Sequence, residues 1–216
     1  MPRYLILKLD GPMQAWGGHT YEDFRPSHLF PTRSGLLGLI AACLGLDRAD
    51  LKAQMQLAES LEFSVRVDQV EGRTPLKLPD FHTVLEARKV DGSSNKNPVV
   101  SRREYLFDAV FSVAVGERPE ASMKLDALAA AVQRPCYTPS LGRRACPLAR
   151  PLFDGWAEAA DAKAALQQLP GCGVIYTEGE ALANSRPLHI RDVPLHTRKR
   201  QFGTRKIYVH ADGGEA

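Results

Sequence analysis

The feature that most restricts the fold is the run of residues 105–115, in which every second side chain is apolar. Alternation with a period of two places the apolar side chains on one face of a β-strand. Residues 61–68 repeat the pattern, with apolar residues at every second position from Leu61 to Val67. Two such strands need a hydrophobic layer on one side, so the chain is predicted to build a half-buried sheet.

Further strands and helices are expected around these two. Residues 4–9 form a short apolar run that ends at a turn, which favours a buried strand, and residues 173–177 have a similar character. Three helices are predicted. The first follows a Ser34 cap, and its inward side chains are Leu36, Leu37, Ile40, Cys43 and Leu44. The second runs from Asp47 or Asp50 to about Ser60, and the third covers residues 122–133 after a Ser122 cap. The resulting order, β-α-β-β-α-β, is the ferredoxin-like arrangement that RNA-recognition domains also use. The predicted fold class is therefore α+β with a ferredoxin-like (RRM-like) core.

Two segments lie outside this core. Residues 69–104 separate the second and third strands by far more than a tight turn needs. We interpret them as carrying a long inserted β-hairpin, a thumb, at about residues 80–104. Residues 179–216 are predicted to add two or three short strands. This makes residues 1–178 the core with its thumb and residues 179–216 a C-terminal β extension.

Positive charge is concentrated in three segments, although the net charge is only +3. Residues 88–103 hold five Lys or Arg and one acid, residues 134–150 four Arg and no acid, and residues 186–206 seven Lys or Arg and one acid. Such separation is typical of a protein that binds a polyanion on one face, although any one segment alone could be a solvated loop. Tyr137 and Phe202 lie within two of the segments, so their rings either stack on unpaired bases or anchor the loops to the core.

Composition and spacing argue against several other classes of protein. The hydrophobic fraction of 44% is too high for a disordered chain, and no stretch approaches the roughly 18 apolar residues of a membrane span. The start of the chain has no signal-peptide pattern. The four cysteines show no paired short spacing, which is typical of cysteines that remain reduced. We therefore expect a cytoplasmic protein with no membrane association.

Three segments have an unusual and specific sequence: residues 4–17 (YLILKLDGPMQAWG), residues 30–45 (FPTRSGLLGLIAACLG) and residues 134–148 (RPCYTPSLGRRACPL). Together they resemble the CasD subunit family of Cascade, the RNA-guided surveillance complex of type I-E CRISPR systems, which belongs to the RAMP superfamily. Weaker likeness continues through residues 80–84, 103–106 and 200–202. The likeness keeps the same order along nearly the whole chain.

This resemblance implies a non-catalytic RNA-binding subunit with the ferredoxin-like fold. One copy would cap the end of Cascade that holds the 5′ handle of the CRISPR RNA (crRNA) and would help to assemble the complex for antiviral defence. The implied partners are the crRNA, the large subunit and the first backbone subunit, with target DNA reached through the complex. The thumb would fold over the guide.

The resemblance and the basic segments together suggest which residues contact RNA. Arg33 and Ser34 stand at a helix start, where backbone amides can meet a phosphate. The other candidates are Gln14 and Trp16 after the first strand, Arg88, Arg102 and Arg103 in the thumb, Tyr137, Gly142, Arg143 and Arg144 in the loop after the helix at 122–133, and Arg200 and Arg205 in the last basic segment.

The alternative is a metal-independent endoribonuclease, because relatives in other CRISPR subtypes cleave repeat RNA themselves. Such cleavage needs a base, an acid and a cation at the phosphate. The candidates are His19, Tyr21, His28 and His82, which form no spacing signature. In type I-E systems a separate subunit performs the processing, so we predict no catalytic residue.

A zinc site can also be drawn from Cys136, Cys146 and Cys172 with His189 or His196. The sequence lacks the short C-x2–4-C spacing that zinc sites favour. It also lacks a Walker loop and an acid-rich magnesium cluster. The sequence therefore predicts neither a metal nor a cofactor.

Overall fold

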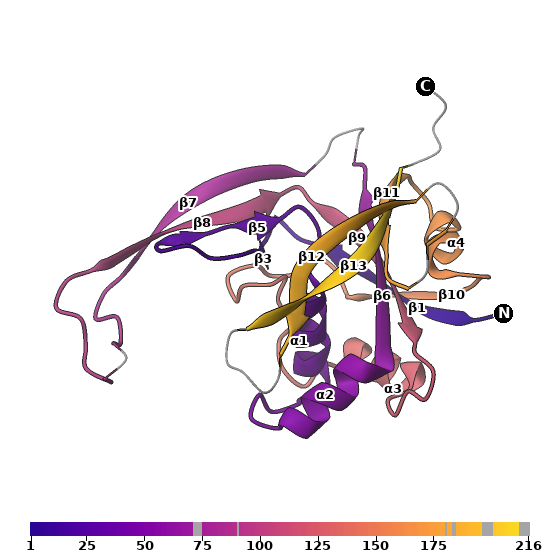
Figure 1. The fold of residues 1–216 in the computed structure, drawn as a ribbon, viewed down its shortest axis with the longest axis horizontal. Helices are drawn as coiled ribbons and strands as arrows, with labels where there is room; N and C mark the ends of the chain where they lie inside the picture. The colour runs from indigo at the N-terminus through magenta and orange to yellow at the C-terminus, as the bar shows by residue number, and fades with distance from the viewer. Residues whose placement is uncertain (71–74, 90, 180, 183–184, 196–200, 212–216) are drawn as a thin grey trace.

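A seven-stranded sheet forms the centre of the computed structural model (Figure 1), which describes residues 1–70, 75–89, 91–179, 181–182, 185–195 and 201–211. Its strands lie in the order β10 (Phe153–Glu158), β1 (Arg3–Asp10), β9 (Val110–Glu117), β6 (Leu61–Asp68), β11 (Gly173–Thr177), β13 (Phe202–His210) and β12 (Arg186–Pro194). Every neighbouring pair in this order is antiparallel. The C-terminal strands β12 and β13 thus extend the sheet beyond β11.

Helices pack on both faces of this sheet. Helices α1 (Arg33–Leu44) and α3 (Leu125–Gln133) share one hydrophobic core with β1, β6 and β9, and α2 (Leu51–Ser60) contacts α1. The short helix α4 (Ala162–Gln167) covers the opposite face, where Leu166 joins a second, smaller core. No helix in the described ranges is both long and apolar enough to cross a membrane.

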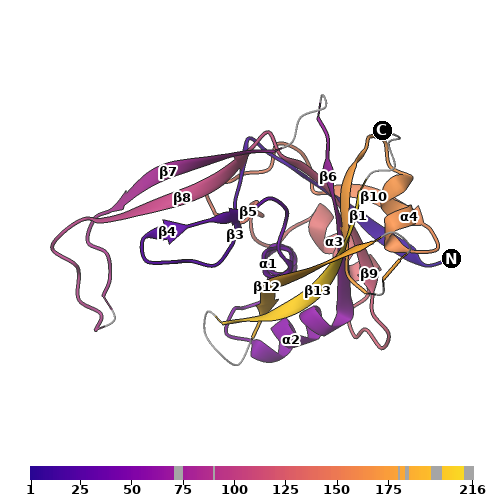
Figure 2. The same ribbon diagram turned by 45° about the horizontal axis from the view of Figure 1, so that its top comes forward.

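A second sheet projects from this body. Strands β7 (Leu76–Val84) and β8 (Val99–Phe107) pair along their whole length as a long hairpin, and Figure 2 shows this hairpin reaching well beyond the helices and the main sheet. Four two-residue strands precede α1: β2 (Met13–Gln14), β3 (Trp16–Gly17), β4 (Phe24–Arg25) and β5 (Ser27–His28). Strands β2 and β4 pair with β8, and β3 pairs with β5, so the chain before α1 supports the base of the hairpin.

The alternating run 105–115 proves to be parts of two strands instead of one. Asp108 takes a left-handed backbone conformation (φ 52°) just after β8 ends, and β9 begins two residues later. Aspartate tolerates this conformation better than most residues, because its short polar side chain can bond locally. Tyr105, Ala109 and Phe111 are nevertheless buried in one core, which explains why the alternation continues across the break.

The strand predicted at residues 173–177 is present, but its place in the sheet is not beside β1. Residues 173–177 do form a strand, β11, but β11 pairs with β6, and the second neighbour of β1 is β10. Residues 153–158 give a weak strand signal, because Gly155 (φ 129°) interrupts the run and its Cα lies at a shift in register opposite β1.

The outer face of β6 is also less exposed than its alternation suggests. The charged residues Arg66 and Asp68 are both buried, because α4 and the turn after it cover this face. Arg66 Nη1 donates to the backbone oxygen of Leu166 (2.8 Å), and Arg66 Nε donates to Asp68 (2.5 Å). The sequence missed α4 and therefore missed this second layer.

Two helices begin with caps other than those predicted. Thr32, not Ser34, caps α1 by accepting a hydrogen bond from a first-turn amide (3.3 Å). Helix α3 begins at Leu125, three residues after Ser122, and the Leu125 amide donates to Glu117 (2.9 Å). In each case the chain enters the helix at a slightly different residue, so another acceptor is within reach.

Candidate nucleic-acid interface

Two arginines that the sequence predicted to contact RNA lie in a buried ion network. Arg33 Nη1 contacts Glu178 Oε2 at 2.5 Å, and both side chains are 4% exposed. Arg205 contacts Glu178 Oε1 (2.5 Å) and holds Asp192 through Nε (2.6 Å) and Nη2 (2.7 Å). Arg118 Nη2 also contacts Glu178 Oε2 (3.1 Å), so two carboxylates are shared by three arginines. The prediction that the guanidinium groups of Arg33 and Arg205 bind RNA is contradicted, because both are engaged inside the protein. Arg200, predicted together with Arg205, lies outside the described residues.

The network influences the ionisation of the groups around it. Burial works against the charge of Arg205, but hydrogen bonds to Asp192 and the charges of Glu178 and Asp192 prevail and raise the pKa of Arg205. Burial also raises the pKa of Glu62 on β6, with the charge of Glu178 adding to it, while two nearby arginines oppose the shift. Burial lowers the pKa of Arg33, although the charge of Glu178 opposes the shift. The interior therefore favours the charged form of Arg205 but disfavours that of Arg33 and a further ionised carboxylate.

The N-terminus of α1 is already occupied by a carboxylate. The backbone amide of Arg33 donates to Asp192 Oδ2 at 2.7 Å, and the amide of Gly35 donates to Thr32. A negative charge at this position is favourable, because the helix dipole and unpaired amides attract it. The predicted phosphate site at Arg33 and Ser34 is therefore wrong: an acid from β12 fills it.

Gln14 and Trp16 are core residues. Both are fully buried, and Gln14 Nε2 donates to the backbone oxygens of Leu9 (3.2 Å) and Ala109 (2.6 Å). Gln14 Oε1 accepts a hydrogen bond from Trp16 Nε1 (3.1 Å). These bonds join the end of β1 to the break between β8 and β9. The expected RNA contacts of the two side chains are contradicted, because the core encloses both.

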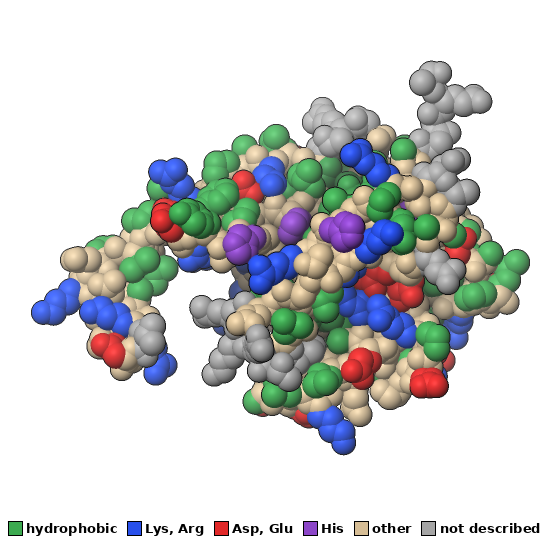
Figure 3. Space-filling view, in the orientation of Figure 1, with side chains coloured by type: hydrophobic (Ala, Val, Ile, Leu, Met, Phe, Trp, Pro, Cys, Tyr) green, Lys and Arg blue, Asp and Glu red, His purple; other side chains and the backbone are tan. Residues whose placement is uncertain are grey.

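Exposed basic and aromatic side chains do lie on the hairpin β7–β8, and Figure 3 shows hydrophobic and Lys or Arg side chains along its length. Phe81 is 65% exposed and stands directly across the hairpin from Arg102, whose guanidinium lies 5.3 Å from the ring centre. Arg103 is partly buried, and Arg88 is exposed near the tip. The sequence predicts RNA contacts for these arginines but not for Phe81, whose one signal is its place within the similar residues 80–84.

The loop after α3 presents Tyr137 and Arg144. The side chain of Tyr137 is 58% exposed, while its backbone amide donates to Ala42 of α1 (3.1 Å). Arg144 is exposed and makes no hydrogen bond or ion pair within the described residues. Gly142 takes φ 89°, and a Cβ there would lie 1.8 Å from the backbone oxygen of Ala15, so this turn requires glycine.

Arg143 is placed differently from its neighbour Arg144. Nη1 of Arg143 donates to the backbone oxygen of Glu104 (3.0 Å) and Nη2 to that of Arg25 (3.1 Å), and the guanidinium lies 4.6 Å from the ring centre of Tyr105. The loop is therefore held against β8 and β4 at the base of the hairpin. We call the following exposed groups the hairpin–loop surface: the side chains of Phe81, Arg102, Tyr137 and Arg144 and the backbone of Gly142.

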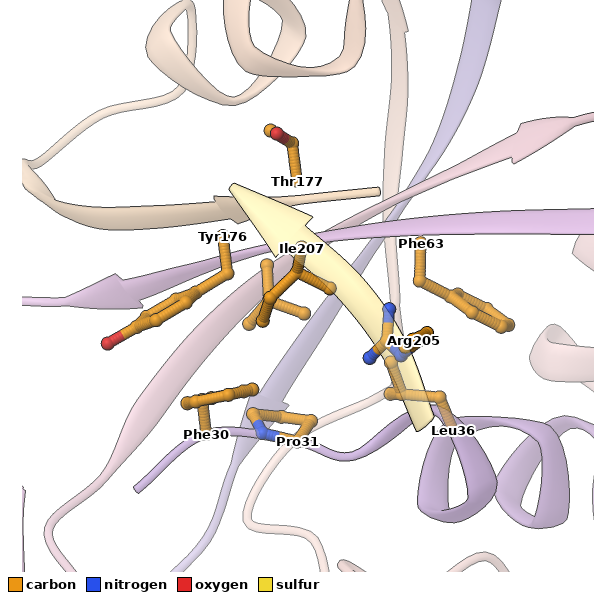
Figure 4. A pocket seen from close by; sticks show the side chains of 9 residues that line it. Phe30, Pro31, Leu36, Phe63, Tyr176, Thr177, Arg205 and Ile207 are labelled. Carbon is orange, nitrogen blue, oxygen red and sulfur yellow. The ribbon is translucent and has the colours of Figure 1, made fainter. Parts of the chain in front are cut away.

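A recess beside the ion network is too small for a nucleotide or a cofactor. Phe30 and Tyr176 stack with ring centres 4.2 Å apart, and Ile207 and Arg205 approach from β13 (Figure 4). The volume of the recess is about 10 Å³, which is room for about one water molecule. The recess is therefore part of the packing between β11, β13 and the entry to α1.

A family model described as CRISPR-associated protein (Cas_Cas5) matches residues 4–208 of the chain. The chain belongs to this Cas5 family. The CRISPR system Cascade subunit CasD of Escherichia coli (strain K12) is 46% identical to it over 219 residues, which cover 99% of this chain and 98% of that protein.

Two solved structures resemble the Cas5 chain over almost its whole length. One, described as a CRISPR RNA-guided surveillance complex, has a TM-score of 0.73 and 30% sequence identity, covering 97% of this chain and 91% of that chain. The other, described as the crystal structure of a Cas protein, has a TM-score of 0.65 and 28% identity, covering 96% and 93%. The mixed α/β fold with its many-stranded sheet is thus shared with other Cas proteins.

The four residues of the nuclease alternative are not joined to one another in this Cas5 protein. No hydrogen bond or ion pair links any two of His19, Tyr21, His28 and His82 in the described part of the chain. His82 Nε2 instead lies 2.9 Å from the Tyr105 hydroxyl and 3.0 Å from Asp80 Oδ2. Burial lowers the pKa of His28; the charge of Asp192 opposes this shift, and the charge of Lys77 adds to it.

The cysteines and histidines also form no metal site where the structure describes them. Among the described residues, no group of three or more His, Cys, Asp or Glu is placed to hold a metal ion. Cys146 is buried, whereas Cys136 and Cys172 are exposed. His196, which completed one version of the zinc alternative, lies outside the described residues.

Proposed function

We propose that this Cas5 protein is a non-catalytic subunit of the CRISPR Cascade surveillance complex, where it binds and caps the 5′ handle of the crRNA and helps to assemble the complex for antiviral defence. The observation that carries the proposal is the 46% identity to the Cascade subunit CasD over 99% of the chain. The hairpin–loop surface supports it, because exposed basic and aromatic side chains, such as Arg102 over Phe81, suit unpaired RNA better than a duplex.

In this proposal the core is ferredoxin-like. The elements β1, α1, β6, β9, α3 and β10 follow one another as β-α-β-β-α-β, with α2 added after α1. Their strand order, β10-β1-β9-β6, supports the assignment, because a ferredoxin-like sheet places its fourth strand beside the first and its third between the first and second. The hairpin β7–β8 is the thumb, and residues 179–216 extend the core of residues 1–178.

Most of the proposed RNA contacts are side chains that the described structure leaves in solvent. Arg102 and Arg144 neutralise handle phosphates, and Phe81 and Tyr137 stack on splayed bases. The proposed set is completed by Arg88, the partly buried Arg103, the backbone of Gly142, and Arg200, which lies outside the described residues. Arg143, whose terminal nitrogens are engaged within the protein, and the predicted residues that the core encloses are left out of it.

The protein partners are the large subunit and the first backbone subunit, and target DNA is reached through the complex. Base pairing by the guide carries sequence recognition in RNA-guided complexes. The task of this subunit is therefore to hold the handle in place, with the projecting hairpin folded over the guide.

Labelled CRISPR repeat RNA mixed with the purified protein in EDTA tests binding and cleavage together. We expect a gel shift with intact RNA. In a salt titration, the double variant Arg102→Ala/Arg144→Ala should bind more weakly, and the slope of log affinity against log salt should fall by about 0.7 for each phosphate of the single strand that the variant no longer neutralises. Arg48→Ala, which removes one positive charge from an exposed residue near α2, is the control for charge loss away from the proposed contacts.

Two outcomes would contradict the proposal. Specific cleavage in EDTA that His82→Ala abolishes would favour the endoribonuclease alternative. A salt slope in the double variant equal to that of Arg48→Ala would mean that neither Arg102 nor Arg144 contacts the RNA.

A further inference from the structure

Arg143 and Arg144 are adjacent and equally charged, but the fold uses them in different ways. The Arg144 side chain is exposed and unpaired within the described residues. Both terminal nitrogens of Arg143 already donate to backbone oxygens. The two-pronged edge with which a guanidinium binds a phosphate is therefore engaged inside the protein.

The contacts of Arg143 reach two separate strands. Nη1 binds the backbone oxygen of Glu104 on β8, and Nη2 binds that of Arg25 on β4. The face of the guanidinium lies over Tyr105, also on β8, at 4.6 Å. Strand β4 pairs with β8 at Arg102 and Arg103, so one side chain links the loop to β8, which carries these two arginines, and to the strand beside it.

The turn that carries Arg143 is itself held by backbone hydrogen bonds. The Leu141 backbone accepts a hydrogen bond from the Ala15 amide (3.0 Å) and donates one to Cys146 (2.8 Å), and the Cys146 amide donates to the backbone oxygen of Arg143 (2.8 Å). Gly142 lets the turn touch Ala15 directly. Arg143 therefore extends from a closed turn that is fixed to the core.

We infer that Arg143 is a positioning residue, which fixes the loop against the base of the hairpin so that both present their exposed side chains to one RNA strand as a preformed surface. The inference rests on the proposed function. A surface ordered before binding avoids the ordering cost that would otherwise weaken association. Lysine cannot replace Arg143, because one ammonium has no planar fork to bridge two carbonyl oxygens while lying over a ring.

The test compares Arg143→Lys and Arg143→Ala with Arg144→Lys and Arg144→Ala in the full-length protein. The first measurement is hydrogen exchange without RNA. The amides of Ala15 and Arg102 donate to Leu141 and Asp23, on either side of the link. We expect both Arg143 variants to exchange these amides on the order of tenfold faster, and both Arg144 variants to leave them unchanged.

The second measurement is the binding of labelled 5′-handle RNA across a salt titration. Arg143→Lys and Arg143→Ala should weaken binding equally and leave the salt slope at the wild-type value, since Arg143 itself touches no phosphate. Arg144→Ala should lower the slope by about 0.7, and Arg144→Lys should restore it.

Rescue of exchange and affinity by Arg143→Lys would overturn the inference, and so would a reduced salt slope in Arg143→Ala, which would make Arg143 a phosphate ligand. Unchanged exchange in both Arg143 variants would also overturn it. If the wild-type protein does not bind the handle RNA, the proposed function fails, while the exchange data still decide whether Arg143 positions the loop. Arg143→Lys keeps the charge and the stem, so the test remains readable if Arg143→Ala unfolds.

Discussion

The arginines of the buried network and those of the hairpin–loop surface are the same side chain in opposite settings. Arg33 and Arg205 meet Glu178 and Asp192 in the interior. On the surface, Arg144 faces no acid within the described residues, and Arg102 lies over an exposed ring instead of a carboxylate. The difference teaches that a basic segment binds a polyanion only through the arginines that the fold leaves unneutralised.

Glu178→Gln is expected to have the largest effect, because it removes one acid from the buried ion network. It leaves the three arginines that contact Glu178 with Asp192 as the remaining acid of the network. Removing one partner of a buried ion pair costs about 3–5 kcal/mol. Urea denaturation should report this loss in the free energy of unfolding, and RNA affinity per folded molecule should not change.

Glu59→Gln is the matched control, because Glu59 is an exposed carboxylate on α2 without an ion pair in the described residues. Its effect should stay within about 0.5 kcal/mol. If Glu178→Gln is as stable as this control, the network does not stabilise the fold.

Gly142→Ala tests the hairpin–loop surface at a position where the backbone conformation, and not a charge, determines the structure. The left-handed φ of 89° and the 1.8 Å approach to Ala15 cannot both survive a Cβ, and strain of this kind costs about 1–3 kcal/mol even where the clash relaxes. We expect lower stability together with weaker RNA binding, measured by thermal unfolding and gel shift.

Gly38→Ala is the control, and we expect it to change the stability in the opposite direction. Gly38 lies within α1 with nothing near its Cβ position, so alanine should stabilise the protein by about 0.5–1 kcal/mol. Equal effects of the two substitutions would show that the turn at residue 142 can adapt to a side chain.

The same contrast explains how much the sequence could predict. Hydrophobic periodicity is local, so β1, β6, α1 and α2 were predicted close to their observed bounds. The ion network escaped prediction because Arg33 and Glu178 stand 145 residues apart. The resemblance pointed to the loop after α3, but nothing local shows that Arg143 turns inward while Arg144 stays in solvent.

Phe81→Ala sharpens the assignment of the exposed aromatic residues. A base stacked on an aromatic ring contributes about 1–3 kcal/mol to binding. Because Phe81 is largely exposed, its removal should leave the unfolding free energy nearly unchanged while RNA affinity falls by that amount in a filter-binding assay. Leu78→Ala removes an exposed apolar side chain without a ring from the same strand, and equal losses from the two variants would argue against stacking.

Glu62→Gln is expected to have the smallest effect, and it tests whether the ionised form of Glu62 destabilises the folded protein. Burial, with the charge of Glu178 adding to it, raises the pKa of Glu62 in the folded protein above its ordinary value. A carboxyl with a raised pKa binds its proton more tightly when folded, so ionising it lowers stability as the pH rises from the ordinary pKa through the raised one. The glutamine variant should therefore gain stability relative to wild type across that window, and urea unfolding from about pH 4 to about pH 7 measures the difference. A difference that is constant with pH, or largest at the acid end, would mean that the arginines around Glu62 already neutralise it, and the interior would then have no excess of negative charge.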